Sequence, residues 1–292
     1  MTGIPVSAHG LVHIYRLEGN DVVALSGVDL DVAAGEVVGL LGPSGSGKST
    51  LLNLFAGLLR PSAGRLTVGR HEIARMDERG LARMRAGDVG VVLQGAMRNL
   101  LPYAKPVDNV RFAQRGARRL AKSADDTAPV LLLEPEEVLD LVGLADHAHT
   151  PLTNLSPGQR QRLAVGVGLA ARPGLLLLDE PTSQLDHEGR DEVLAAVTDI
   201  NRDLGTTVVA VTHDPDVAER LPRTVTIRDG RVGAEGRRGE EYAVVARDGS
   251  LTLPPDVLER VPPGSLLRVT IVDEDAVRLD RTETGAGEGS VA

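Results

Sequence analysis

Short apolar runs and longer helical patterns alternate along most of this chain. The runs at 37–41 (VVGLL), 175–178 (LLLL) and 207–211 (TVVAV) are too short for typical helices and indicate buried strands. Helical patterns are expected from Lys48 to about Leu59 and from Asp186 to Leu204. Strands that alternate with helices predict a parallel sheet with crossover helices, so the main body is expected to be an α/β domain.

Other segments depart from this alternation. The stretches LVHIY and VVALSGVDLDV, which precede a turn at residues 34–36, are expected to form strands. Residues 77–170 have a mainly helical pattern, interrupted near residues 99–102. The small, polar stretch 122–129 is expected to be an exposed loop, and Asp229-Gly230 forms a turn that closes the main body.

The pattern changes after about Glu235. Residues 234–240 (AEGRRGE) indicate a solvated linker, and residues 241–281 alternate between apolar and polar positions with two proline pairs. We expect a small β-rich appendage over 241–281, near the lower size limit for independent stability. A disordered tail is expected at 282–292.

Composition excludes several classes of function. Apolar residues make up 42% and charged residues 25% of the 292, which is typical of a soluble globular protein. A formal net charge of -9 and an aromatic content of 2% argue against nucleic-acid binding, which needs basic and stacking surfaces. Cysteine is absent, so disulfides and zinc fingers are excluded. We find no signal peptide and no transmembrane segment, so any membrane role is expected to come through a partner.

A glycine-rich loop follows the strand at 37–41. It matches the pattern G-x-x-x-x-G-K-[ST] between a strand and a helix, and its backbone N–H groups and helix N-terminus are suited to phosphates. Lys48 would reach the β- and γ-phosphates, and the Ser49 hydroxyl would bind Mg²⁺. The sequence therefore predicts a nucleotide site rather than a flexible turn with a surface lysine. Its residues are Gly42, Pro43, Ser44, Gly45, Ser46, Gly47, Lys48, Ser49 and Thr50.

Two carboxylates follow the second buried strand. Asp179 and Glu180 come directly after LLLL, and ligands of parallel sheets bind at the carboxyl ends of the strands. We expect Asp179 to face Mg²⁺ and Glu180 to accept a proton from the attacking water. Without the upstream phosphate loop, such a pair would indicate only a solvated turn.

Residues 155–162 (LSPGQRQR), between these two halves, resemble the signature L-S-G-G-Q of ABC (ATP-binding cassette) ATPases. Further residues match that family's motifs in order. Tyr15 matches the adenine-stacking aromatic, and Gln94, which ends a strand, matches the Q-loop glutamine. Asp186 matches the D-loop aspartate and His213 the switch histidine. The resemblance covers about residues 8–233. It implies a P-loop NTPase fold with a mainly parallel mixed sheet, an antiparallel β subdomain and a helical subdomain at about 95–170.

The resemblance also implies a mechanism. Two copies would pack head to tail and clamp ATP between the phosphate loop of one and the signature of the other. Glu180, His213, Gln94 and Lys48 are the expected catalytic residues, and Ser49, Gln94 and Asp179 the expected Mg²⁺ ligands. ATP and Mg²⁺ are thus the implied cofactors. The residues expected to act from or across the partner are Ser156, Gly158, Gln159 and Asp186.

Pro157 departs from the family pattern, which has glycine at this position. Proline lacks an N–H that could contact phosphate. However, Ser156 at the N-cap and proline in the first turn is a favourable helix start, and Gly158 is retained. We expect a working signature. The alternative is a degenerate signature that does not act on the ATP bound by the partner copy.

The stretches GPSGSGKSTLLN and NLLPYAKPVDNV resemble the branch that contains lipoprotein-releasing, macrolide-export and cell-division ATPases. Such proteins work with a separate integral permease, which implies a peripheral, cytoplasmic location on the inner face of the cell membrane. The alanine- and arginine-rich composition suggests a bacterial source. The alternative is a soluble ABC ATPase that acts as a regulatory or nucleic-acid- or ribosome-associated switch.

The appendage resembles AbrB-like swapped-hairpin domains, through the segments 244–257 and 263–269. Such domains dimerise and often bind DNA. From Glu240 to the end, however, eleven acidic residues face five arginines, a net charge of -6 that disfavours phosphate. The expectation is therefore dimer stabilisation or regulation, with a simple β-cap on the ATPase as the alternative.

Overall fold

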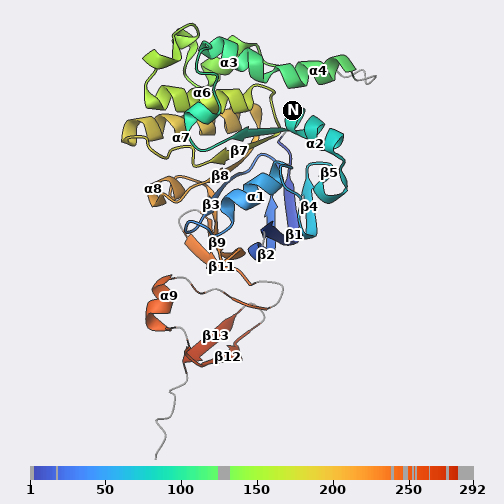
Figure 1. Cartoon of the computed structure of the whole chain (residues 1–292). Helices are drawn as coiled ribbons and strands as arrows, with labels where there is room; N and C mark the ends of the chain where they lie inside the picture. Colours follow the sequence, from blue (N-terminus) through green and yellow to red (C-terminus); the bar gives the residue numbers. More distant parts are fainter. Residues whose placement is uncertain are drawn as a thin grey trace, which may run out of the picture.

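A seven-stranded sheet runs through the main body, in the order β11-β10-β9-β3-β8-β7-β6 (Figure 1). Strands β9, β3, β8, β7 and β6 are parallel, and β10 and β11 extend one edge as antiparallel hairpins. The strands are β3 (Val37–Leu41), β6 (Val89–Val92), β7 (Leu175–Asp179), β8 (Thr207–Val211), β9 (Arg223–Arg228), β10 (Arg231–Arg237) and β11 (Glu240–Ala243).

This computed structural model describes residues 3–17, 19–123, 132–237, 240–245, 249–251, 253, 255–262, 264–273 and 276–281. None of the helices within these ranges has the length and apolar content that a bilayer crossing requires.

The central strands are buried on both faces, which explains their continuous apolar sequence. All four leucines from Leu175 to Leu178 are 0% exposed, and β8 beside them is buried throughout. Helices cover both sides of a parallel sheet, so no position on such a strand faces water. The predicted parallel sheet with crossover helices is confirmed.

A second, four-stranded antiparallel sheet has the order β2-β1-β4-β5. Helix α1 (Lys48–Phe55) contributes Leu52 and Phe55 to a core shared with Leu25 of β2 and Val209 of β8, so this helix is buried between the two sheets. The strands of the second sheet are β1 (Val6–Leu17), β2 (Asn20–Val32), β4 (Ala63–Val68) and β5 (His71–Glu72).

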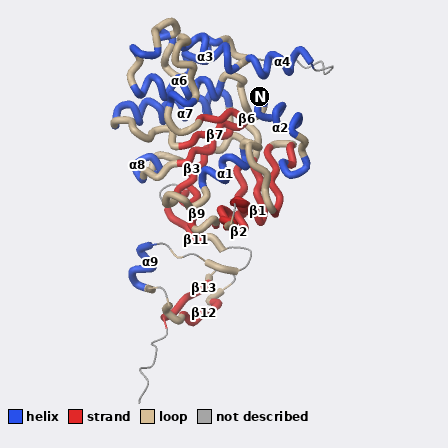
Figure 2. Tube along the Cα trace, in the orientation of Figure 1, coloured by secondary structure: helices blue, strands red, loops and turns tan. Residues whose placement is uncertain are grey.

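The other face of the central sheet is covered by helices, which gather at one end of the molecule (Figure 2). Apolar side chains of α6 and α7 form a core with Leu176 and Leu178 of β7. The helices are α2 (Glu78–Gly87), α3 (Pro106–Ala113), α4 (Arg115–Ser123), α5 (Pro135–Leu141), α6 (Pro157–Leu169), α7 (His187–Leu204) and α8 (Pro215–Ala218). Short 3-10 turns are η1 (Ile73–Arg75), η2 (Ala96–Arg98), η3 (Ala145–His147) and η4 (Leu152–Asn154).

Several elements differ from the sequence-based expectations. The stretch 77–170 is not helical throughout, because the strand expected before Gln94 is the edge strand β6, where Val89–Val92 pairs with β7. Helix α1 ends at Phe55 instead of near Leu59, since Gly57 has a φ of 61° that ends the helix. The expected loop at 122–129 begins with the last residues of α4, and residues 124–131 lie outside the described part.

The C-terminal segment starts as part of the central sheet. Residues expected to form a linker belong instead to a hairpin, in which Gly236 of β10 pairs with Glu241 of β11. Beyond it lie α9 (Pro255–Arg260) and a two-stranded sheet of β12 (Leu267–Ile271) and β13 (Val277–Arg281), at the far end from the helical layer (Figure 1). The expected disordered tail at 282–292 lies outside the described residues.

Candidate active site

The phosphate loop connects β3 to the N-terminus of α1, as its pattern predicts. All three of its glycines have left-handed backbone conformations, with φ of 136° at Gly42, 79° at Gly45 and 102° at Gly47. A Cβ atom would approach the Ile227 carbonyl oxygen to 2.1 Å at Gly42 and the Ala24 carbonyl oxygen to 2.5 Å at Gly47. Only glycine fits there, so the loop can bring backbone N–H groups toward an anion at the start of the helix.

Lys48 lies inside this loop. Its Nζ donates hydrogen bonds to the carbonyl oxygens of Gly42 (2.8 Å) and Pro43 (2.7 Å), and the residue is 7% exposed. Burial lowers the pKa of the Lys48 ammonium, and the nearby Glu180 and Asp179 carboxylates partly offset that shift. The ammonium group is therefore partly desolvated before any ligand binds, which makes it a suitable partner for a phosphate.

Asp179 ends β7 and lies opposite the phosphate loop. The Ser49 hydroxyl donates to Asp179 Oδ1 across 3.4 Å, a contact between residues 130 apart in sequence. Burial raises the pKa of Asp179, while the hydrogen bond from Ser49 lowers it and the charge of Glu180 raises it. This carboxylate is thus poorly compensated in the protein alone, which is the state expected of a group that awaits a cation.

Glu180 and His213 form a pair at the same edge of the sheet. His213 Nδ1 lies 2.7 Å from Glu180 Oε1, and the residues follow the adjacent strands β7 and β8. Glu180 has a φ of 50°, which is unusual for a residue with a side chain and is typical of functional sites. The Glu180 side chain is 12% exposed and the His213 side chain 66% exposed, so the imidazole reaches the open side of the site.

The aromatic end of the site is built by β1 and β2. The Tyr15 hydroxyl lies 3.2 Å from the Thr50 hydroxyl, and its ring contacts His13 edge to face at 4.7 Å. Val22, which pairs with Tyr15 across the two strands, and Val23 are exposed by 48% and 57%. They provide an apolar wall beside the phenol ring that the sequence analysis missed. Two successive valines at the start of a strand were the available signal. Because successive side chains point to opposite faces of a strand, at least one of the two had to lie outside the core.

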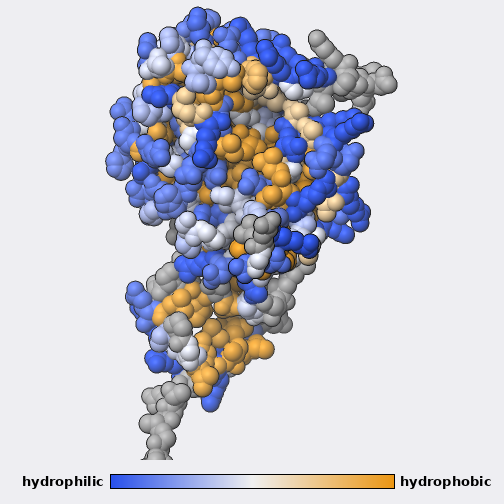
Figure 3. All heavy atoms as spheres, in the orientation of Figure 1, coloured by the Kyte–Doolittle hydropathy of each residue, from blue (hydrophilic) through white to orange (hydrophobic). Residues whose placement is uncertain are grey.

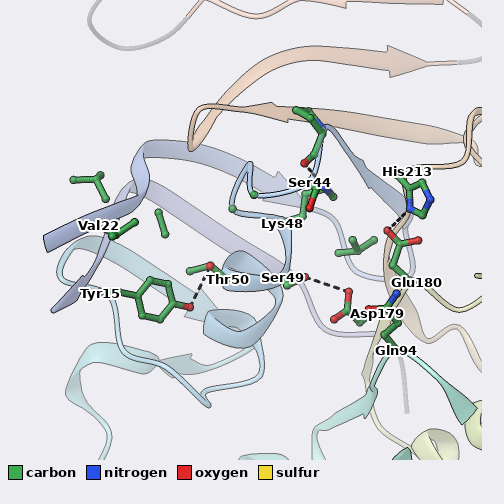
Figure 4. Close-up of a pocket in the computed structure, with 16 residues that line it drawn as sticks. Tyr15, Val22, Ser44, Lys48, Ser49, Thr50, Gln94, Asp179, Glu180 and His213 are labelled. Atoms are coloured by element: carbon green, nitrogen blue, oxygen red, sulfur yellow. Dashed lines mark hydrogen bonds and ion pairs between the residues drawn. The ribbon is translucent and has the colours of Figure 1, made fainter. Parts of the chain in front are cut away.

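One cavity of about 720 Å³ gathers these groups, and Figure 4 shows their side chains around it. Its size is within the usual range for small-molecule sites. Gly42 and Ser46, also predicted, lie at the base of the loop, where Ser46 is 5% exposed. The residues that line the cavity are Tyr15, Val22, Val23, Ala24, Pro43, Ser44, Gly45, Gly47, Lys48, Ser49, Thr50, Gln94, Asp179, Glu180, Val211 and His213.

The predicted residues outside the phosphate loop that do not line this cavity are Ser156, Gly158, Gln159 and Asp186. Ser156 caps α6: its hydroxyl accepts a hydrogen bond from the Gln159 N–H at 3.1 Å, and Pro157 occupies the first turn. Asp186 caps α7 by accepting from the Gly189 N–H at 2.9 Å. Within one chain these residues, with Gly158, begin helices and do not reach the phosphate loop's cavity.

The oxygen donors at the cavity suit a magnesium ion. Mg²⁺ prefers hard oxygen ligands and usually keeps only one or two from the protein, with phosphates and water completing the set. Ser49 and Asp179 provide two such oxygens side by side, and Gln94 lines the same cavity. No cluster of three or more His, Cys, Asp or Glu residues suited to a metal occurs in the described ranges. The arrangement therefore fits an ion that is shared with a nucleotide.

Comparison with known proteins agrees with this geometry. The family profile described as "ABC transporter" matches residues 25–183. The lipoprotein-releasing system ATP-binding protein LolD of Anaeromyxobacter dehalogenans is 44% identical over 212 residues, which are 73% of this chain and 85% of that protein. The methionine import ATP-binding protein MetN of Streptomyces coelicolor is 38% identical over 256 residues, 86% of this chain and 70% of that one.

Solved structures give the same result. The dimeric post-hydrolysis state of the ATP-binding cassette MJ0796, bound to ADP and Pi, superimposes with a TM-score of 0.68 at 30% identity. The match covers 80% of this chain and 98% of that one. The chain therefore belongs to the ABC transporter family, as one of its ATP-binding and ATP-hydrolysing subunits.

Proposed function

We propose that this chain binds Mg·ATP in the cavity described above and hydrolyses it to drive a separate membrane permease. The observation that carries the proposal is the meeting of the phosphate loop, the Asp179–Glu180 pair, His213 and Tyr15 around one cavity. The adenine ring would stack on Tyr15 beside Val22, and the triphosphate would lie along the loop toward β7. Peripheral attachment to the cytoplasmic side of the membrane follows from this role.

The residues of the cavity divide the chemistry among them. Glu180 would orient the attacking water and accept its proton, and the His213 ring would donate to the γ-phosphate. Lys48, now bonded to two loop carbonyls, would exchange them for phosphate oxygens. Bound Mg²⁺ would neutralise charge on the β- and γ-phosphates, held by Ser49, Asp179 and Gln94.

A second copy of the chain is expected to complete the site. Ser156, Gly158 and Gln159 begin α6 outside the cavity, so their predicted contact with phosphate has to come from a partner. The related cassette MJ0796 is dimeric in its post-hydrolysis structure. Head-to-tail closure on ATP and reopening after phosphate release would then provide the mechanical output.

The proposed permease contact is an exposed apolar surface next to Gln94. Met97, Tyr103 and Phe112 are exposed by 46%, 86% and 48%, on the segment between β6 and the end of α3. Gln94 lies at the start of this segment and also lines the cavity, so a contact on the surface can influence the catalytic site. Exposed aromatic residues of this kind are typical of protein interfaces.

A substitution on this surface tests the permease assignment. We expect Tyr103→Asp to abolish co-purification of an integral permease from detergent-solubilised membranes, because a charge replaces the most exposed aromatic ring. Tyr242→Asp on β11 is the matched control, since Tyr242 is 47% exposed and lies far along the chain. If ribosomal or DNA-associated proteins co-purify instead of a permease, the soluble-switch alternative is favoured.

Among transporter branches we favour the one that includes lipoprotein-releasing ATPases. Support comes from the stretch NLLPYAKPVDNV and from the 44% identity to LolD of Anaeromyxobacter dehalogenans. The matches to methionine import proteins are of similar length but lower identity. The cargo would be selected by the permease.

We also propose that the appendage contacts the appendage of a second copy. Val269, Ile271 and Val277 are exposed by 65%, 79% and 62%. Cross-strand pairing of Val269 with Leu279 and of Ile271 with Val277 puts them on one face of the β12–β13 hairpin, opposite Arg268 and Thr270. Figure 3 shows the apolar residues gathered at this end of the molecule. A two-stranded sheet with a bare apolar face is marginal alone, and the acidic appendage disfavours anionic membranes and nucleic acid.

A pair of neighbouring substitutions distinguishes the two faces of this hairpin. We expect Ile271→Asp to weaken nucleotide-independent self-association of the full-length chain by about tenfold or more, because it places a charge in the buried interface. Thr270→Asp, on the opposite face, is expected to leave association unchanged in sedimentation velocity. Equal self-association of both variants would contradict the proposed interface and leave a β-cap as the better description.

A further inference from the structure

The start of helix α6 is held by a reciprocal pair of hydrogen bonds. The Gln159 N–H donates to the Ser156 hydroxyl at 3.1 Å, and the Ser156 N–H donates to Gln159 Oε1 at 2.8 Å. This capping box is important here because Pro157, with no N–H, stands where the family pattern has glycine. The position of the Ser156 hydroxyl and the Gly158 N–H therefore depends on the side chain of Gln159.

Gln159 is in turn held from outside the signature. Its Nε2 lies 3.0 Å from Nε2 of His147, which is the last residue of the turn η3. His147 Nδ1 faces the Thr150 hydroxyl at 3.4 Å. The elements around it anchor this turn, since the Val107 N–H at the start of α3 donates to the Ala148 carbonyl at 3.1 Å.

These contacts determine which nitrogen of His147 carries the proton. Because Oε1 of Gln159 accepts from the Ser156 N–H, the group that Gln159 presents to His147 is its NH₂ donor. His147 Nε2 must then be an acceptor, so the ring is neutral with its proton on Nδ1, directed at Thr150. A histidine that is positively charged cannot make this set of hydrogen bonds.

We propose that His147 is a positioning residue for the signature, which keeps Ser156 and Gly158 in place for the partner's ATP by accepting a hydrogen bond from Gln159. The inference rests on the proposed clamping of ATP between two copies. It goes beyond that proposal because it assigns a role to a residue outside the signature itself.

Protonation of His147 would disrupt this arrangement. Two donors, the Nε2–H of the ring and the NH₂ of Gln159, would face each other. Turning the Gln159 amide by half a rotation would place its NH₂ against the Ser156 N–H, so one hydrogen bond is lost in either orientation. ATP-driven dimerisation should therefore be weaker when His147 is protonated than when it is neutral.

The charged groups on the surrounding elements do not pair with His147. They are Asp146 on its own turn, Glu136, Glu137 and Asp140 on α5, Lys105 and Asp108 at the start of α3, and Arg160 on α6. In the part of the chain that the structure describes, no salt bridge within 4 Å involves His147. The nearest polar partners of its ring are the uncharged Gln159 and Thr150.

The test uses Glu180→Gln chains that also carry Ile271→Asp, which weakens the proposed appendage contact. Their ATP-dependent dimer is measured by sedimentation velocity at about pH 8 and about pH 6. Adding His147→Leu, which removes the acceptor, should weaken the dimer by about fivefold at the higher pH, the usual effect of one hydrogen bond. Adding His147→Gln, whose side-chain oxygen can replace Nε2 but does not titrate, should restore a tight dimer and reduce the pH dependence by the same factor. Any effect of pH elsewhere in the complex is common to all these chains and cancels.

His149→Leu is the matched control, since His149 is exposed two residues away, and it should change nothing. Binding of a fluorescent ATP analogue to the monomers should also be unchanged, because the phosphate loop is distant from His147. If Glu180→Gln chains do not dimerise with Mg·ATP under any condition, the clamp itself is wrong. If they dimerise equally well with leucine at 147, or if His147→Gln keeps the full pH dependence, the role of His147 is refuted.

Discussion

Glu180→Gln is expected to lower ATP turnover by about 10²- to 10⁴-fold, the usual contribution of a general base. Glutamine has the same shape and can still accept a hydrogen bond from His213, which lies 2.7 Å from the carboxylate. It cannot accept the proton of the attacking water. The strained backbone at this position, with a φ of 50°, is retained because the side chain is isosteric.

The same variant should accumulate a dimer with Mg·ATP, because closure precedes hydrolysis and reopening follows it. An assay of released phosphate measures the turnover rate. Sedimentation velocity with and without Mg·ATP measures the fraction of dimer. Glu188→Gln, an exposed glutamate near the start of α7, is the control and should behave as the unaltered chain. Turnover that survives Glu180→Gln within about tenfold would mean that another group activates the water.

Asp179→Asn is expected to remove Mg²⁺-dependent hydrolysis and yet to stabilise the protein without nucleotide. Loss of a residue that merely supports a metal ligand commonly costs about ten- to a hundredfold, so loss of an expected ligand should reduce turnover by at least about 100-fold. Without ATP, however, burial raises the pKa of Asp179, which means that the folded chain disfavours the ionised carboxylate.

The sign of the stability effect follows from linkage. A carboxyl group whose pKa is higher in the folded chain than in the unfolded chain destabilises the fold as pH rises through the folded-state pKa. The neutral amide avoids this cost and can still accept a hydrogen bond from Ser49. Because solvent screens this partly exposed carboxylate, the free energy of unfolding should rise by less than about 1 kcal/mol at neutral pH. A gain in stability from the loss of a functional group is common in proteins.

Thermal unfolding without nucleotide, measured from about pH 4 to about pH 8, checks this expectation. The midpoint of the Asp179→Asn chain should exceed that of the unaltered chain by up to about 2 °C at neutral pH, and the two should converge at acid pH. Asp21→Asn, at an exposed position on β2, provides the control. A midpoint that falls at neutral pH would show that Asp179 is already well compensated in the empty site.

The elements that local sequence could predict are those whose residues carry their own signal. Leu175–Leu178 had to be a buried strand, because four adjacent leucines cannot alternate between core and water. The start of α6 was predictable from Ser156 and Pro157, and the phosphate loop from glycines that alone tolerate its backbone. In each case the deciding residues are neighbours in the chain.

The position of two strands within the sheet depends on pairing with strands elsewhere in the chain. Val89–Val92 forms β6 because β7, more than 80 residues later, offers an open edge, and Glu240–Ala243 joins the main sheet because β10 does. Neither segment has a sequence pattern that shows which strand it pairs with. Val22 and Val23 line the cavity because the register of β1 and β2 places them beside Tyr15.

The amino-acid sequence alone thus determined the type of site, the phosphate loop and the pair of carboxylates, because each motif is contiguous and its chemistry belongs to its residues. Only the tertiary structure decided how they meet. Glu180 touches His213 across 33 residues and Ser49 touches Asp179 across 130, since parallel strands β3, β8 and β7 end at one edge of the sheet. The contact of His147 with Gln159 has the same origin, in the packing of a turn against a helix start that no periodicity encodes.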